Sequence, residues 1–246
     1  MRLIPIDLWA VSLVPENAAD GDYRRLLNQE ERARADRYLQ QQDAERWTVA
    51  RATLRLVLAS YLDGEPGDIA FEYDTYNKPF LPPDRLTEPL HFNLSHSDEA
   101  MLLAVSGVSA MGIDVEAIKP LDDIVQVARR FFEPTETAAL LALPEADQLS
   151  AFYRCWTRKE AVLKAVGTGL STPLDSFTVA FLPGADASMR WGDSWEGPRE
   201  SLQLTGVTPC PGYIGALAVP ATGATLETRW RRVEDLQPGA LSLHSN

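Results

Sequence analysis

The sequence predicts a mixed α/β (α+β) protein made of two similar halves of about 110–120 residues, each a small sheet packed with helices and related by pseudo-two-fold symmetry. Two observations lead to this fold class. Short segments with strand character alternate with longer segments of helical periodicity. In addition, Leu103-Ala104-Val105-Ser106 is echoed by Leu217-Ala218-Val219-Pro220, an offset of 114 residues in a chain of 246. The expected domains are residues 1–108 and residues 109–246.

The first half is expected to begin with a strand near residues 3–12, followed by two helices near 24–39 and 43–62. The second helix ends at Asp63-Gly64, a pair typical of helix termination. Short strands are expected near 68–73, 89–94 and 100–106, with a turn-rich stretch from Asp74 to Pro89 between the first two.

The second half follows the turn from Gly107 to Gly112 and begins with a strand around Asp114. Pro134 suits the first turn of a helix that runs to about Leu143. A longer helix from about Asp147 is expected to stop at Gly167, because glycine is common just after a helix C-terminus. Strands near 174–182, 200–207, 212–219 and 225–233 complete this half.

Three carboxylates and a lysine stand at positions that a folded chain does not favour for charge. In the strand Gly112–Glu116, Asp114 and Glu116 share one face while their apolar neighbours share the other. In the long helix, Glu160 falls in the middle of the apolar stripe and Lys164 lies one turn further on. The stripe consists of Leu149, Phe152, Tyr153, Trp156 and Leu163.

A charge directed at the core must be paired or bound to a metal ion. The three acidic oxygen donors, Asp114, Glu116 and Glu160, suit a hard cation such as Mg²⁺, which commonly bridges protein carboxylates and substrate phosphates. The alternative is a buried network of ion pairs that joins the strand to the helix.

Composition excludes several classes of protein. The formal charge of −12 argues against a nucleic-acid binder. The sequence contains no run of about 18 apolar residues, so a membrane span is not expected. The N-terminus lacks the pattern of a signal peptide, and two cysteines are too few for a disulfide framework, so a cytoplasmic location is expected. Between Arg24 and Arg55, however, eight arginines outnumber five acids, which fits either solvated helices or a local site for a phosphorylated small molecule.

Four motifs, in this order, carry a family resemblance. They are Asn77-Lys78-Pro79, His91-Phe92-Asn93-Leu94-Ser95-His96-Ser97, Gly112-Ile113-Asp114-Val115-Glu116, and the helical segment from Trp156-Thr157-Arg158-Lys159-Glu160 to Gly169-Leu170. Together they resemble the 4′-phosphopantetheinyl transferases, in particular the long, pseudo-dimeric type that activates the surfactin synthetase. The resemblance runs from about residue 28 to about residue 182, and the later strands rest on pattern alone.

The resemblance implies transfer of the phosphopantetheine arm of coenzyme A to a serine of an apo acyl carrier or peptidyl carrier domain, with release of 3′,5′-ADP. It implies Mg²⁺ held by Asp114, Glu116 and Glu160, with Glu160 accepting the serine proton, directly or through a water. Lys164 is implied to contact the phosphates and to stabilise the leaving group. The first half would then supply adenine and phosphate contacts, and the second half the metal ligands and catalytic helix.

Further coenzyme contacts follow from the same resemblance. Ser95 and His96, expected in a loop just after a strand, would hold the phosphates, with the histidine giving a hydrogen bond and charge. Lys78 and Pro79 match the segment over the adenine, although Asn-Lys-Pro is also an ordinary turn. Arg46 is matched to the arginine that grips the 3′-phosphate, with Arg34 or Arg51 as alternatives, and Glu30 and Glu31 stand where relatives often carry lysine.

The expected partners are coenzyme A and carrier domains of fatty acid, polyketide or nonribosomal peptide synthesis, bound by a monomer. Because carriers are acidic, docking needs a local basic patch on this acidic chain. An ordinary structural role is an equal alternative for each candidate residue. The candidates are Lys119, Arg129, Arg130, Arg158 and Lys159, flanked by Phe131 and Phe132. A Mg²⁺-dependent nuclease or phosphohydrolase could use the same acidic residues. A non-catalytic carrier-binding module would be expected to have lost one of the four charged residues.

Overall fold

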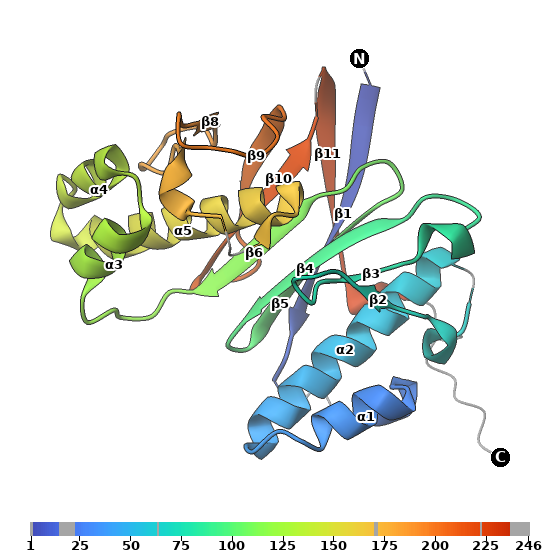
Figure 1. Cartoon of the computed structure of the whole chain (residues 1–246). Helices are drawn as coiled ribbons and strands as arrows, with labels where there is room; N and C mark the ends of the chain where they lie inside the picture. Colours follow the sequence, from blue (N-terminus) through green and yellow to red (C-terminus); the bar gives the residue numbers. More distant parts are fainter. Residues whose placement is uncertain (1, 15–22, 63, 170–171, 222, 237–246) are drawn as a thin grey trace.

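A computed structural model describes residues 2–14, 23–62, 64–169, 172–221 and 223–236. The helices α2 and α5 lie on the outer faces of two sheets that pack against each other, so that the order of layers is helix, sheet, sheet, helix (Figure 1). No helix of these residues is long and apolar enough to cross a membrane. Asp63 and Leu170, both considered in the sequence analysis, lie outside the described residues.

The first half contains β1 (Arg2–Ser12), α1 (Gln29–Ala35), α2 (Gln41–Leu62), β4 (His91–Ser97) and β5 (Ala100–Ser106). A small pair of strands, β2 (Glu72–Tyr73) and β3 (Pro79–Phe80), lies between α2 and β4. The capping box of Asn28 and Glu31 starts α1, because each side chain accepts the backbone N–H of the other. Short 3₁₀ turns occupy Tyr23–Leu26, Pro66–Asp68 and Pro83–Arg85.

The second half begins with β6 (Gly112–Ala117), followed by α3 (Ile124–Phe131), α4 (Pro134–Leu141) and α5 (Glu145–Val166). Gly167 ends α5 in the left-handed conformation, with φ of 78°, and Pro134 occupies the first turn of α4, both as predicted. The remaining strands are β7 (Phe177–Val179), β8 (Met189–Trp191), β9 (Leu202–Val207), β10 (Tyr213–Pro220) and β11 (Ala224–Arg231), with 3₁₀ turns at Leu174–Ser176 and Val233–Asp235.

The two sheets repeat one strand order, which confirms the prediction of two similar halves. The first sheet has the order β11-β1-β5-β4 and the second the order β6-β10-β9. The pattern β1-β5-β4 is thus repeated as β6-β10-β9: the first strand of each half pairs with a later strand, which also pairs with the strand just before it in sequence. The strand β11 lies outside this repeat, on the other edge of β1. The echoed sequences lie in the equivalent strands β5 and β10. The boundary between residues 108 and 109 stays a prediction.

Alternating side chains divide the core into layers. Ile4, Ile6 and Leu8 of β1 pack with Ile113 and Val115 of β6 between the two sheets. The opposite face of the first sheet packs on α2, through residues that include Trp9, Leu54, Leu58, Leu103 and Val105. The opposite face of the second sheet packs on α5, through residues that include Phe152, Val162, Leu163, Ala216 and Ala218.

One prediction about local structure was wrong, and one helix was not predicted. Ser95 and His96 lie inside β4, not in a loop after a strand, because β4 and β5 form a hairpin that pairs as far as Ser97 with Ala100. The helix that was not predicted is α3, which spans only eight residues and which Asp123 caps by accepting the backbone N–H of Gln126.

Candidate active site

Gly112 sets the distance between β6 and α5. A Cβ atom at this glycine would overlap the backbone of Ala161 and Ala165, so only glycine permits the strand to lie this close to the helix. Because side chains alternate along β6, Asp114 and Glu116 then face away from the sheet-sheet core, toward the helix that carries Glu160 and Lys164.

The carboxylates of Asp114 and Glu160 each carry one buried oxygen with no hydrogen-bond partner among the described residues, Asp114 Oδ2 and Glu160 Oε1. Asp114 Oδ1, in contrast, accepts hydrogen bonds from Ser95 Oγ at 2.7 Å and from Lys164 Nζ at 2.7 Å. Burial, followed by the nearby charge of Asp114, raises the pKa of Glu160 to about 6. The two acids therefore repel each other, and a cation between them would relieve the repulsion.

Glu116 is the third acid of this cluster. Burial raises its pKa, and the charge of Asp114 adds to the increase. The hydroxyl of Ser97 opposes it by donating to Glu116 Oε2 at 2.6 Å. One oxygen of Glu116 is thus held in place by a residue of the first half.

These acids fit magnesium better than a metal held by protein ligands alone. Within the part of the chain that the structure describes, no three or more His, Cys, Asp or Glu side chains form a ready metal centre. Mg²⁺, however, is usually bound by one or two carboxylates together with waters and substrate phosphates. Two buried carboxylate oxygens without partners, with Glu116 nearby, are a donor set of that kind.

A cavity of about 340 Å³ adjoins the acids and lies between the halves. Its walls come from residues 74–94 of the first half and residues 160–169 of the second, and include Lys78, Pro79, Glu160 and Lys164. Lys78 Nζ donates to the carbonyl oxygen of Lys164 at 3.0 Å, which joins the two segments. Burial lowers the pKa of Lys78, and the charge of Lys164 lowers it further.

Ser95 and His96 point in opposite directions because they are neighbours in β4. Ser95 Oγ lies between Asp114 and Lys164, 3.0 Å from Lys164 Nζ. His96 lies on the other face and lines two smaller cavities of about 280 and 170 Å³. Burial and then the charge of Lys164 lower the pKa of His96. The role of His96 at the phosphates stays a prediction.

Comparison with known proteins identifies the family. The model of the 4′-phosphopantetheinyl transferase superfamily matches residues 110–218, and that of the 4′-phosphopantetheinyl transferase N-terminal region matches residues 17–107. The 4′-phosphopantetheinyl transferase HetI of Nostoc sp. is 35% identical over 219 residues, which cover 89% of each chain. Sfp of Bacillus subtilis is 34% identical over 174 residues, 70% of this chain and 74% of Sfp. This chain belongs to the 4′-phosphopantetheinyl transferases.

Several arginines of the transferase's first half pair with acids. Arg46 contacts Asp98 at 3.4 Å and Glu99 at 3.1 Å, and shares the 280 Å³ cavity with His96. Arg34 and Arg51, the two alternatives, both line the 170 Å³ cavity, which His96 also reaches. The choice of an arginine for the 3′-phosphate stays a prediction.

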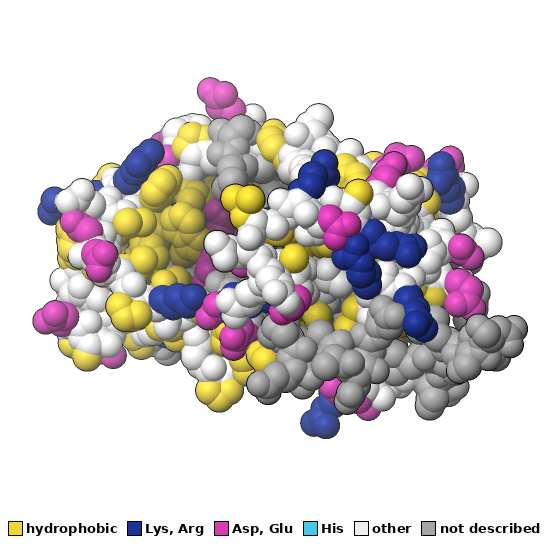
Figure 2. Space-filling view, turned by 90° about the horizontal axis from the view of Figure 1, so that it is seen from below, with side chains coloured by type: hydrophobic (Ala, Val, Ile, Leu, Met, Phe, Trp, Pro, Cys, Tyr) yellow, Lys and Arg dark blue, Asp and Glu magenta, His cyan; other side chains and the backbone are white. Residues whose placement is uncertain are grey.

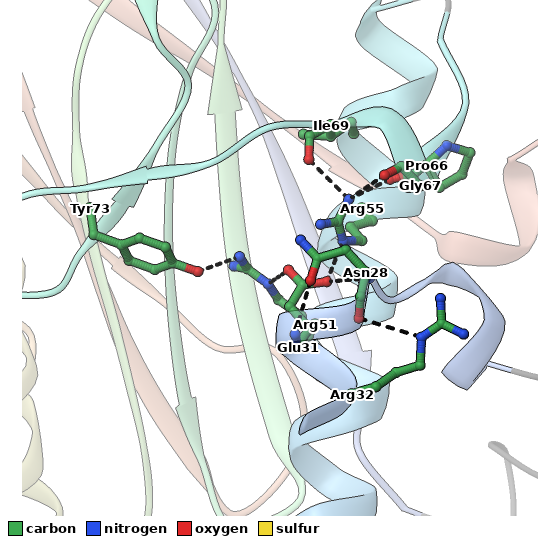
Figure 3. Close-up of polar contacts among 9 residues, drawn as sticks. All are labelled: Asn28, Glu31, Arg32, Arg51, Arg55, Pro66, Gly67, Ile69 and Tyr73. Carbon is green, nitrogen blue, oxygen red and sulfur yellow. Dashed lines mark hydrogen bonds and ion pairs between the residues drawn. The ribbon is translucent and has the colours of Figure 1, made fainter. Parts of the chain in front are cut away.

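Glu31, which stands where relatives often carry lysine, forms ion pairs with two arginines of the transferase. Figure 3 shows its carboxylate between Arg51 and Arg55, at 2.5 and 2.7 Å. Arg55 also donates to the carbonyl oxygens of Pro66 and Ile69, and Arg51 donates to the hydroxyl of Tyr73 at 2.6 Å. This cluster fastens α1, α2 and the segment leading to β2 to one another.

Two candidates for a basic docking patch on the transferase were wrong. Lys159 is fully buried and donates to the carbonyl oxygens of Leu174 and Phe177, with Glu136 as its ion partner. Arg158 is also buried and donates to the carbonyl oxygen of Ala180. The flanking Phe132 belongs to the core around α5 and Phe131 packs against that core.

Lys119, Arg129 and Arg130 remain exposed. On the face shown in Figure 2, hydrophobic side chains gather over the part that carries α3, α4 and α5, whereas a group of Lys and Arg side chains lies toward α1 and α2. The docking surface of the transferase stays a prediction.

Two residues near the acids were missed by the sequence analysis, Asn93 and Ser97. Together with Ser95 they form a polar row at every second position of β4, and all three reach β6. A period of two polar residues in His91–Ser97 is the signal that could have found them.

Proposed function

We propose that this transferase delivers the phosphopantetheine arm of coenzyme A to carrier serines with the help of Mg²⁺ held by Asp114, Glu116 and Glu160. The observation that carries the proposal is a pair of buried carboxylate oxygens, Asp114 Oδ2 and Glu160 Oε1, that have no hydrogen-bond partner in the described part of the chain. When bound, the metal ion supplies positive charge that offsets the charge of the coenzyme pyrophosphate.

In the reaction, the serine Oγ bonds to the β-phosphorus of coenzyme A as the bond from that phosphorus to 3′,5′-ADP breaks. The serine must lose its proton as this bond forms. A carboxylate is a better proton acceptor when its pKa lies close to the working pH. Because the pKa of Glu160 is raised to about 6, we assign the proton to Glu160, directly or through a water.

Lys164 supplies the positive charge on the protein side of the site. Its ammonium group already lies 2.7 Å from Asp114 Oδ1 and 3.0 Å from Ser95 Oγ, and it lines the cavity between the halves. From this position we assign it to the phosphates and to the charge that develops on the leaving 3′,5′-ADP.

The coenzyme itself is assigned to the three neighbouring cavities, which share lining residues. Lys78 and Pro79 line the 340 Å³ cavity and are assigned to the adenine end, whereas Ser95 and His96 are assigned to the phosphates. Arg46 is assigned to the 3′-phosphate, since it shares a cavity with His96. Charge-assisted contacts of this kind favour coenzyme A over its dephospho form.

The proposal includes a monomer that carries a single site. Groups from both halves line the central cavity, so one chain supplies every assigned residue. The scarcity of cysteines favours a reducing, cytoplasmic setting. The accepted carriers are acyl or peptidyl carrier domains, and a panel of apo-carriers will distinguish them.

The test measures the mass gain of each apo-carrier in the presence of coenzyme A, with Mg²⁺ or with a chelator. We expect stoichiometric release of 3′,5′-ADP only with the metal ion, and no turnover in Asp114→Asn or Glu160→Gln. Metal-independent transfer would contradict the magnesium site. Cleavage of nucleic acid or of coenzyme A without a carrier would instead support the nuclease or phosphohydrolase alternative.

A further inference from the structure

The strands β4 and β6 lie next to each other at the junction of the halves (Figure 1), yet they belong to different sheets and do not pair through their backbones. Every second side chain of β4 reaches across instead. Asn93 Oδ1 accepts the N–H of Ile113 at 2.7 Å, and Ser95 Oγ donates to Asp114. Ser97 Oγ donates to Glu116. We call Asn93, Ser95 and Ser97 the β4 clasp.

The hydroxyl of Ser97 is fixed from two sides. It accepts the backbone N–H of Ala117 at 3.2 Å and donates to Glu116 Oε2 at 2.6 Å. A serine hydroxyl carries a single proton, so accepting from Ala117 leaves that proton for the carboxylate. The short hydrogen bond thereby restricts one oxygen of Glu116 to a defined place beside Asp114.

We propose that Ser97 is a positioning residue that orients Glu116 for the divalent cation. The inference rests on the magnesium site proposed above, and it adds a residue that does not itself bind the metal. Asp114 and Glu116 are like charges on the same face of β6, so a Glu116 side chain without this hydrogen bond would turn away from Asp114. Metal binding would then have to restore its orientation, at a cost in affinity.

The size of the effect follows from other metal sites. Groups that hydrogen-bond to a metal ligand change metal affinity or activity by about 10- to 100-fold when they are removed. We therefore expect Ser97→Ala to weaken metal binding by about this factor. Turnover should recover when Mg²⁺ is raised, because the ligands themselves remain. Ser97→Thr keeps the hydroxyl and should keep the affinity.

Ser106 offers a matched control on the neighbouring strand. Its hydroxyl also donates to an oxygen, the carbonyl of Pro5 at 2.8 Å, and also accepts a backbone N–H, that of Val108 at 3.2 Å. Ser106 is buried but lies away from the acids. Ser106→Ala therefore removes an equivalent pair of hydrogen bonds, and it should lower the melting temperature without changing metal affinity.

The experiment measures Mn²⁺ binding to the full chain with coenzyme A by electron paramagnetic resonance, beside the Mg²⁺ dependence of kcat. Weaker binding in Ser97→Ala, with near wild-type affinity in Ser97→Thr and Ser106→Ala, would support the proposal. Equal binding in wild type and Ser97→Ala would overturn it, as would equal losses in Ser97→Ala and Ser106→Ala. A wild-type protein that binds no Mn²⁺ would instead refute the magnesium site itself.

Discussion

At the scale of single residues, the site gathers more negative charge than it neutralises. Asp114, Glu116 and Glu160 lie together, and Lys164 pairs with only one oxygen of Asp114. The pKa of Glu160, raised to about 6 first by burial and then by Asp114, expresses this excess. The carboxylates that are proposed to bind Mg²⁺ therefore repel one another in the metal-free protein.

This excess predicts that Glu160→Gln stabilises the metal-free enzyme while abolishing transfer. Since the pKa of Glu160 is about 6 in the fold and about 4.5 ordinarily, ionisation costs stability as pH rises from about 4.5 through 6. The free energy of unfolding of the variant should exceed that of the wild type by about 1–2 kcal/mol at pH 8, and the two should be equal below pH 4.5. Urea unfolding across this range, with a chelator present, measures the gain. A variant that turns over normally with Mg²⁺ would contradict the assignment.

We expect His96 to take up a proton when coenzyme A binds. Burial and Lys164 lower its pKa in the free enzyme, and bound phosphate would raise it. Between the two values the complex holds more protons, so affinity should fall as pH rises through this window. Calorimetry in buffers of different ionisation enthalpy measures the uptake. The proton uptake should disappear in His96→Gln. The control is His91→Gln, at the other end of β4, in which the uptake should persist. Uptake that survives in His96→Gln would rule out this role.

At the scale of elements, periodicity predicted the strands and helices that build the site, but contacts distant in sequence decided the rest. The strand around Asp114 and the long helix to Gly167 were found because their patterns are local. The burial of Lys159 was not found, because its partner Glu136 lies on another helix and its carbonyl acceptors follow α5. The strands β2 and β3, of two residues each, and β8, of three, are too short to show a period.

The cluster around Glu31 predicts a sharp loss of stability in acid. Despite burial, which alone would raise it, hydrogen bonds from Arg55 and Arg51 hold the pKa of Glu31 below its ordinary value of 4.5. The stability it contributes is present above pH 4.5 and is lost as pH falls through the lower folded value.

Glu31→Gln should therefore lower the free energy of unfolding by about 3 kcal/mol at neutral pH, because it leaves two buried arginines without their acidic partner. Urea unfolding from pH 7 to pH 3 measures this, and the difference from wild type should shrink in acid. The exposed neighbour provides the control, since Glu30→Gln should change stability by less than about 0.5 kcal/mol. Equal effects of the two substitutions would show that the cluster is not needed.

At the scale of the whole molecule, the halves share a topology but not the site. In the first sheet, β1 takes the place that β6 has in the second, and its sequence contains a single acid, Asp7. In the second sheet, β9 takes the place of β4, and Leu202–Val207 contains neither serine nor histidine. Among the described residues, the acids and the Ser-His pair therefore meet at the junction of β4 and β6 and not at the related one.

This asymmetry predicts one coenzyme A per chain, bound without a second subunit. Calorimetry with Mg²⁺ should give a stoichiometry of one, and sedimentation should give the mass of a monomer with and without coenzyme. If Arg46 contacts the 3′-phosphate, dephospho-coenzyme A should bind more weakly by about 1.5–3 kcal/mol. Two coenzymes per chain, or a site that forms only in a dimer, would contradict this architecture.

The parallel pairing of β11 with β1 has a consequence for the order in which the protein can fold. Arg2 pairs with Ala224 and Trp9 with Arg231, so β1 lies beside a strand that is synthesised more than 200 residues later. Until that late strand emerges, one edge of β1 has no partner and is open to pairing with other chains. The nascent first sheet therefore stays incomplete until residues 224–231 have been made, and its exposed edge is where chaperones would be most needed.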